Sequence, residues 1–404
     1  HALMFHTCQL LAGELFPDEV FTNSGLTGRQ MQAKAKNMLY DWFVTFRKEG
    51  FTEWNSSPYL PIDTLGFGSL YAFAQDPAMR ELGREGMDFA YYLLAVHSQQ
   101  GIFASSSGRT YIKEQFGNWS NCPSGLSWIG YGYGVPGHAG KGITSYCLSD
   151  YEPPKEFAQW FSIPRGKEMI CQTTQGNDGY VDLYTYKTAD YMMTSANDFH
   201  PGEPGHQENP FQLTFNAVAQ LWVTHPGERV LFGAARPSYW AGNGTLPKVN
   251  QYKAFAGLIY DIAPEHPVDF THLYLPSMEF DRCEVEGKWA FVQLGSAYAA
   301  VYCSNGMRMQ DFGSNKDREC IAEGRRCIWL VRAAQADEFA AFEDFKAAMR
   351  GAALDADAEG RRYRFVDPVY GELRCQWGET LYVNDAPMQY SGFDNYGKLT
   401  MQEK

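Results

Sequence analysis

The spacing of apolar residues changes near residue 166, and this change constrains the fold more than any other feature. Before it, apolar side chains recur at helical intervals, as in the run from Met31 to Phe46. After it, they alternate at every second position, as in residues 181–186, which is the period of a strand. Helices first and strands afterwards predict an α+β chain with segregated layers.

The N-terminal part carries start and stop signals for several helices. Thr27 and Gln30 form a T-x-x-Q capping-box pattern, and Gly50 ends the helix that follows. Asp76-Pro77 opens another helix. Paired helices with short loops and broad apolar faces favour an (α/α) hairpin array, although only five or six helices are visible. We therefore expect an incomplete (α/α) toroid over residues 1–165.

The remainder of the chain consists of short alternating segments bounded by Gly, Asp or Asn, which are typical of antiparallel strands. Segments 290–294 and 298–303 flank a Gly-Ser turn and predict a hairpin. One amphipathic helix, over residues 339–349, interrupts the strands. We expect a central antiparallel sheet region over residues 166–280 and a β-sandwich over residues 281–404.

Charge and motifs argue against several classes of function. The 34 basic and 47 acidic side chains give a net charge of −13 without a Lys/Arg run, so a nucleic-acid partner is disfavoured. No stretch reaches the ~20 apolar residues of a membrane span. The sequence lacks Walker A, H-E-x-x-H and G-x-S-x-G motifs, and no G-x-G-x-x-G follows an expected strand. The 27 Phe, 25 Tyr and 10 Trp residues instead suggest a surface that stacks sugars or other flat ligands.

Two segments in the helical part contain candidate site residues. The polar and aromatic loop of residues 53–59 holds Asn55 and Tyr59; Asn55 either serves a site or caps the next helix, while Tyr59 either serves a site or packs. In the segment that follows the long helix, Arg109 and Tyr111 share one face if the chain is extended. A guanidinium close to a phenol lowers its pKa, so this spacing can prepare an acid/base tyrosine. An exposed hairpin with the arginine stacked on the tyrosine is the alternative.

Two further segments lie among the expected strands. The loop of residues 198–209 holds His200 and His206 on a Gly/Pro scaffold, where His206 is a candidate base and the pair a weaker candidate metal site. The alternative is a solvated loop without a catalytic or metal-binding role. Residues 236–245 set aromatic side chains beside an amide, which suits either a sugar-binding wall or a β-turn above a buried tryptophan. The candidates in this last segment are Tyr239, Trp240 and Asn243.

In the order of these elements and in three short motifs, the chain resembles the polysaccharide lyases of the heparinase II/III-like superfamily, which includes alginate and glycosaminoglycan lyases. The motifs are the loop at Asn55, the Gly-Arg-x-Tyr segment at Arg109 and Tyr111, and the Gly-x-Gln-Glu loop around His206. The resemblance implies an incomplete (α/α) toroid combined with antiparallel β-sheets. The chain departs from the family's pattern at Asn209, where a histidine is expected.

The resemblance also implies a reaction, β-elimination next to a uronate of an acidic polysaccharide. Asn55, helped by Arg109, would neutralise the sugar carboxylate, which makes the neighbouring C5 proton acidic. His206 and Tyr111 would share the roles of base and acid. The candidates for sugar contact are Tyr59, His200, Tyr239, Trp240 and Asn243. The sequence requires no cofactor, and a divalent metal near His200 and His206 stays open.

Two other functions remain as alternatives. A glycoside hydrolase on a similar toroid needs two carboxylates roughly 5–9 Å apart, for which Asp198, Glu203 and Glu208 are candidates. A catalytically silent sugar-binding or structural relative is the third possibility. The compartment is also open, because nine scattered cysteines without a CxxC pair favour free thiols and a reducing compartment, whereas the substrate class favours secretion or the periplasm.

Overall fold

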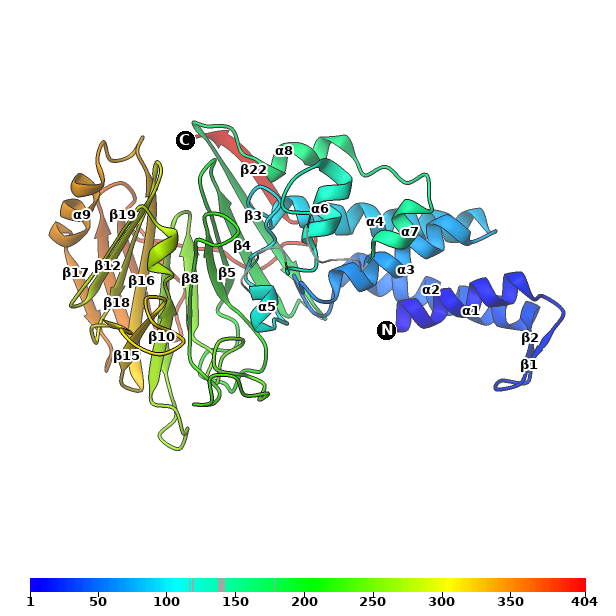
Figure 1. Cartoon of the computed structure of the whole chain (residues 1–404), viewed down its shortest axis with the longest axis horizontal. Helices are drawn as coiled ribbons and strands as arrows, with labels where there is room; N and C mark the ends of the chain where they lie inside the picture. The colour runs from blue at the N-terminus through cyan, green and yellow to red at the C-terminus, as the bar shows by residue number, and fades with distance from the viewer. Residues whose placement is uncertain (116, 118–119, 137–141, 178) are drawn as a thin grey trace.

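The computed structural model describes residues 1–115, 117, 120–136, 142–177 and 179–404, and it confirms a mixed α+β fold. The helical N-terminal part occupies one end of the molecule, and stacked sheets occupy the other (Figure 1). The helices are α1 (Ala2–Leu15), α2 (Gly28–Glu49), α3 (Leu60–Phe73), α4 (Pro77–Val96), α5 (Ile112–Gln115), α6 (Ser124–Tyr131), α7 (Ile143–Cys147), α8 (Ala158–Phe161) and α9 (Phe342–Gly351). None of those helices is long and apolar enough to cross a bilayer.

The capping box expected at the start of α2 is present. The Thr27 hydroxyl accepts from the Gln30 backbone N–H, and the Gln30 side chain accepts from the Thr27 N–H at 2.9 Å. Gly50 caps the other end with φ +67°, a conformation that favours glycine. The expected helix start at Pro77 is also confirmed, because the Asp76 carboxylate accepts from the Ala78 N–H at 2.9 Å.

Helices α3 and α4 approach closely because small residues line their contact. A Cβ added at Gly83 would lie 2.5 Å from the Tyr71 backbone nitrogen, and one at Gly86 would lie 2.2 Å from the Phe67 ring. The Phe67 ring lies in an aromatic cluster with rings from α2 and α4. The cluster comprises Trp42, Phe43, Phe46, Phe51, Phe67 and Phe89.

A nine-stranded antiparallel sheet forms the middle of the molecule, between the helices and the outer sheets (Figure 1). Its order is β14 (Arg308–Met309), β15 (Glu319–Glu323), β10 (Phe270–Tyr274), β7 (Gln220–Thr224), β6 (Phe211–Thr214), β5 (Met192–Asn197), β4 (Val181–Lys187), β3 (Lys167–Gln175) and β22 (Lys398–Glu403). Residues of β3 and β22 also belong to the core of the helical part, so this sheet anchors the helices.

A six-stranded antiparallel sheet shares a large hydrophobic core with the nine-stranded sheet. Its order is β11 (Arg282–Glu286), β12 (Trp289–Leu294), β13 (Ala297–Cys303), β16 (Arg326–Gln335), β9 (Phe255–Asp261) and β8 (Lys248–Tyr252). The expected Gly-Ser hairpin is the β12–β13 pair, in which Leu294 faces Ala297. Both sheets take strands from either side of residue 280, so the regions expected over 166–280 and 281–404 are interleaved in space.

Two smaller sheets complete the fold. The five-stranded sheet runs β17 (Leu354–Asp357), β18 (Arg362–Asp367), β19 (Gly371–Gln376), β20 (Tyr382–Val383) and β21 (Ala386–Pro387), and β1 (Val20–Phe21) pairs with β2 (Leu26–Thr27) beyond α1. The Phe365 ring of β18 stacks on the Phe255 ring of β9 with centroids 5.7 Å apart. The five-stranded sheet therefore packs on the six-stranded sheet.

A buried lysine, Lys187 of β4, connects the nine-stranded sheet to the helical part. Its Nζ donates to the carbonyl oxygen of Ala95 at 2.9 Å and to that of Trp160, and its side chain has no exposed surface. Burial lowers the pKa of Lys187 to about 7. An unfolded lysine titrates near 10.4, so between about pH 7 and pH 10 the unfolded chain binds more protons at this residue than the folded chain. The free energy of unfolding therefore rises with pH across this window.

We expect the Lys187→Met variant to lose this contribution, because methionine has no proton to bind. The slope of unfolding free energy against pH should fall by up to about 1.4 kcal/mol per pH unit between about pH 7.5 and pH 9.5. Urea unfolding followed by circular dichroism measures the slope. The matched control is Lys398→Met, which removes an exposed lysine of β22. Equal slopes for wild type and Lys187→Met would contradict the assignment.

Candidate active site

Two of the candidate loops are joined by backbone hydrogen bonds. Ser107 and Asn209 exchange a reciprocal pair, with the Ser107 N–H donating to the Asn209 carbonyl at 2.9 Å and the Asn209 N–H donating back at 2.7 Å. The Thr110 N–H donates to the Gln207 carbonyl at 3.0 Å. The segment that contains Arg109 therefore runs beside the loop that contains His206, and these bonds fix the relative position of the two.

The loop of residues 53–59 joins the same assembly. The Gly108 N–H donates to the Trp54 carbonyl at 2.8 Å, and the Ser56 hydroxyl donates to the Arg109 carbonyl at 3.4 Å. A Cβ at Gly108 would lie 2.6 Å from the Trp54 indole nitrogen, so only glycine allows this contact. Three loops that are distant in the sequence thus meet beside the nine-stranded sheet, where α5 also lies (Figure 1).

Arg109 lies at the centre of this assembly. Its guanidinium forms an ion pair with Glu53 at 2.8 Å and donates to the Tyr111 hydroxyl at 3.4 Å. The same group lies 4.9 Å from the centroid of the Tyr59 ring, at cation–π distance. Arg109 thus contacts both the carboxylate of Glu53 and the phenol of Tyr111.

Tyr111 lies among groups that lower the pKa of its phenol. The hydrogen bond from Arg109 is the main cause that lowers the pKa of Tyr111, and the Gln207 side chain and the positive charge of Arg236 act in the same direction. Tyr111, Gln207 and Arg236 also line one pocket of about 240 Å³. The phenol therefore faces a space that a substrate can enter, among groups that stabilise its ionised form.

Asn55 belongs to this assembly but does not face that pocket. Its side chain is 2 % exposed, and its Nδ2 donates to the Ser106 carbonyl at 3.4 Å. Its backbone has φ +46°, in the left-handed region that asparagine tolerates better than most residues. The amide nitrogen of Asn55 thus contacts the segment before Arg109, and Asn55 is not among the residues that line the pocket at Tyr111.

The two histidines lie in the same loop and differ in their surroundings. His206 is exposed, and its backbone N–H donates to the Glu208 carboxylate at 2.5 Å. Among the residues that the structure describes, no side-chain contact of His206 with Tyr111 is found. The His200 imidazole lies 3.4 Å from Glu203 and packs edge-on against the Phe199 ring.

A metal centre at these histidines gains no support from their surroundings. No group of three or more His, Cys, Asp or Glu side chains with suitable geometry occurs over the described ranges. Of the carboxylates proposed for hydrolysis, Asp198 pairs with the buried Lys248 and accepts from Asn250 at 3.0 Å. This pairing gives Asp198 a structural partner. The carboxylates of Glu203 and Glu208 contact residues of their own loop, His200 and the His206 N–H.

Tyr239, Trp240 and Asn243 are buried, with 8, 3 and 0 % of their surface exposed. The Trp240 ring stacks on His272 with centroids 4.0 Å apart, and the Tyr239 hydroxyl donates to Glu319 at 2.6 Å. Asn243 accepts from the His225 N–H at 3.0 Å and donates to the Glu208 carbonyl at 3.1 Å. These side chains hold the loops together, and none of the three faces an open surface for a sugar.

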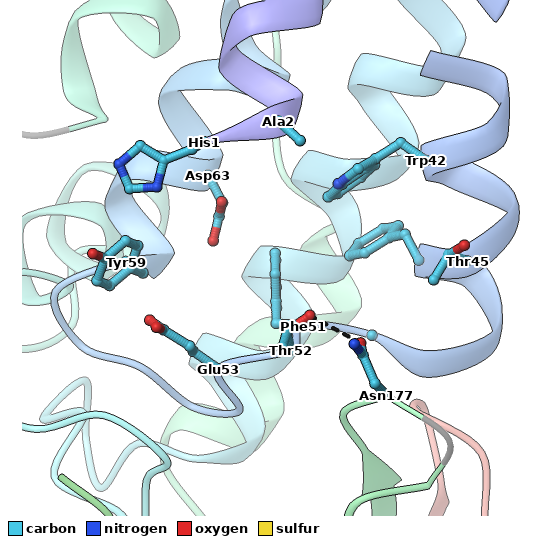
Figure 2. Close-up of a pocket in the computed structure, with 12 residues that line it drawn as sticks. His1, Ala2, Trp42, Thr45, Phe51, Thr52, Glu53, Tyr59, Asp63 and Asn177 are labelled. Atoms are coloured by element: carbon cyan, nitrogen blue, oxygen red, sulfur yellow. Dashed lines mark hydrogen bonds between the residues drawn. The ribbon is translucent and has the colours of Figure 1, made fainter. Parts of the chain in front are cut away.

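A second pocket, of about 440 Å³, is lined by Glu53 and Tyr59, both of which contact Arg109 (Figure 2). Glu53, Tyr59 and Asp63 line it, and Figure 2 shows the carboxyl groups of Glu53 and Asp63 beside the Tyr59 ring. Burial raises the pKa of Asp63 to about 7, and the negative charge of Glu53 adds to this shift. The remaining walls are His1, Ala2, Trp42, Thr45, Phe46, Gly50, Phe51, Thr52 and Asn177.

The structure therefore brings Tyr59, Arg109 and Tyr111 together, while Asn55 contacts the segment before Arg109 and His206 lies on the loop that is hydrogen-bonded to that segment. It adds Glu53, Gln207 and Arg236, which sequence reasoning did not single out. All three lie within segments that the sequence marked as polar or aromatic, and a systematic search for charged residues in those segments could have found them. No family model matches this chain, and no curated protein matches it.

Proposed function

We propose that the chain is a polysaccharide lyase that cleaves a uronate-containing saccharide by β-elimination. The observation that carries the proposal is the contact of Arg109 with the Tyr111 hydroxyl at the wall of an open pocket. The acidic substrate suits a site with two arginines, although the whole chain is negatively charged. We also assign the N-terminal helices to an incomplete (α/α) toroid and the packed sheets to a β-sandwich, as in the heparinase II/III-like lyases.

The proposed reaction needs a base at C5 and an acid at O4 of the uronate. Ionised Tyr111 removes the C5 proton, the C4–O4 bond breaks, and a double bond forms between C4 and C5. The protonated phenol then returns its proton to the departing O4, so that one residue fills both roles. Arg109 supports both steps, because it stabilises the phenolate before the first step and orients the hydroxyl for the second. His206 is the alternative base or acid on the adjacent loop.

Incubation with a panel of uronans tests this function. A lyase releases saccharides with an unsaturated uronate end, which absorb in the ultraviolet and are identified by mass spectrometry. A hydrolase releases reducing ends without unsaturation. Binding without either product would show a silent relative and end the proposal.

The role of Arg109 predicts a shift in the pH dependence of turnover. Arg109 lowers the pKa of Tyr111, so its removal should raise that pKa and reduce the ionised fraction of the phenol at any given pH. We expect Arg109→Met to move the ascending limb of the pH–rate profile toward alkaline pH and to lower turnover at neutral pH by about tenfold or more. Arg109→Lys keeps a positive charge and should shift the limb less. An unshifted limb in Arg109→Met would show that Tyr111 does not titrate in the reaction.

A second candidate function, glycoside hydrolysis, is favoured by one observation in the larger pocket. Burial raises the pKa of Asp63 to about 7, and Glu53, which pairs with Arg109 at 2.8 Å, lines the same pocket. Glycosidases use two carboxyl groups, one of which has a raised pKa and serves as the general acid. If the panel yields reducing ends without unsaturation, Asp63→Asn should abolish them and Tyr111→Phe should not.

A further inference from the structure

Arg236 is a second cation at the tyrosine, contributed by the connection between β7 and β8. Its guanidinium lies 5.4 Å from the centroid of the Tyr111 ring. It lines the pocket of about 240 Å³ together with Tyr111 and Gln207. The helical part of the chain supplies Arg109 and the sheet part supplies Arg236, so guanidinium groups from both parts lie within 6.0 Å of the centroid of the Tyr111 ring.

The two arginines differ in their charge partners. Arg109 is already paired with Glu53 at 2.8 Å. Arg236 is exposed, and no carboxylate in the described ranges lies within ion-pair distance of it. Arg229, on the same connection, pairs with Asp269 at 2.6 Å. Arg236 is therefore the guanidinium at this pocket that can form an ion pair with a negatively charged ligand without first leaving a carboxylate of the protein.

The backbone around Arg236 is held in place before any ligand binds. The Glu228 carboxylate accepts from the Ala235 N–H at 3.0 Å, one residue before the arginine. On the other side, the Gly227 N–H donates to the Ser238 carbonyl and the Ser238 N–H donates to the Ala241 carbonyl, both at 3.0 Å. These bonds close the loop on itself, so the fold sets the position of the backbone that carries Arg236.

We propose that Arg236 binds the free carboxylate of the sugar unit whose C5 proton Tyr111 removes. This inference rests on the function proposed above and specifies its substrate as the free acid rather than its ester. A carboxylate beside the C5–H bond resists loss of the proton, because the developing enolate adds negative charge to a group that is already charged. A guanidinium binds a carboxylate through two parallel N–H···O bonds and offsets that charge. A methyl ester is uncharged and offers no such pair.

The ratio of kcat/KM on the free acid to kcat/KM on the ester tests this assignment. The probes are polymannuronate, polyguluronate and polygalacturonate oligosaccharides, each as the sodium salt and as the methyl ester prepared from it. We expect wild type to prefer the salt and Arg236→Met to lose about 10²-fold on the salt with a far smaller change on the ester. The ratio should fall accordingly, and Arg236→Lys should restore part of it. Arg229→Met, which removes a paired arginine from the same connection, should leave the ratio unchanged.

A merely structural role for Arg236 would reduce turnover of salt and ester alike, and that outcome would overturn the inference. A wild-type protein that turns over neither form would count against the lyase function itself. In that case equilibrium titration of the same oligosaccharides decides: tighter binding of the salt than of the ester, lost in Arg236→Met, supports the inference. Equal affinity of wild type for salt and ester would refute it.

Discussion

Tyr111→Phe should abolish elimination and leave saccharide binding nearly intact. Phenylalanine keeps the ring that Arg109 and Arg236 face but lacks the hydroxyl that takes and returns the proton. Loss of one general acid or base costs about 10²- to 10⁴-fold in rate, and this variant loses both roles at once. The measurement is kcat for release of unsaturated product, together with the affinity for the same oligosaccharide by titration.

The control for this experiment is Tyr40→Phe, which removes a hydroxyl from an exposed tyrosine of α2. It should match wild type in both measurements. Full activity in Tyr111→Phe would remove this residue from the mechanism and direct attention to His206. Lost binding together with lost turnover would instead assign Tyr111 to substrate recognition.

The second large effect concerns stability, at the buried Arg332 of β16. Its guanidinium donates to Asp367 and to Glu338, both at 2.7 Å, and lies 4.1 Å from the centroid of the Tyr370 ring. Only 2 % of Arg332 and 2 % of Asp367 are exposed. Replacing the arginine by methionine leaves the buried Asp367 without its cation and leaves Glu338 with Lys404 alone, and breaking a buried pair in this way costs about 3–5 kcal/mol.

We therefore expect Arg332→Met to lower the free energy of unfolding by about that amount, measured by urea denaturation at neutral pH. Arg364→Met is the matched control, because Arg364 forms a surface pair with Glu372 and is half exposed. An exposed pair of this kind contributes about 0–1 kcal/mol. A loss below about 1 kcal/mol in Arg332→Met would show that the carboxylates find other partners or become protonated.

The parts of the fold that the sequence predicts well are those determined by neighbours along the chain. The capping box of Thr27 and Gln30, the start of α4 at Pro77 and the β12–β13 hairpin each depend on a few consecutive residues. Their hydrogen bonds and turn conformations follow from local geometry alone. For the same reason, the two-residue spacing of Arg109 and Tyr111 anticipates their contact.

The arrangement of the site could not be obtained in this way, because it depends on contacts between distant segments. Trp240 and Asn243 belong to a segment with the composition of a sugar-binding surface, but His272 and Glu208 cover them in the folded chain. Arg236 has no sequence pattern that connects it to Tyr111, more than a hundred residues away. Its place over the ring follows from how the β7–β8 connection meets the helical part.

The pairing of β22 with β3 has a consequence for biosynthesis. During translation, β3 emerges early and can pair with β4, but its other edge stays open until residues 398–403 leave the ribosome. Because Leu399 and Met401 pack against the helical core, part of that core also stays exposed until these residues have been synthesised. An unpaired strand edge is a template for association between nascent chains. Premature termination before residue 398 should therefore yield aggregated polypeptide rather than a smaller folded protein.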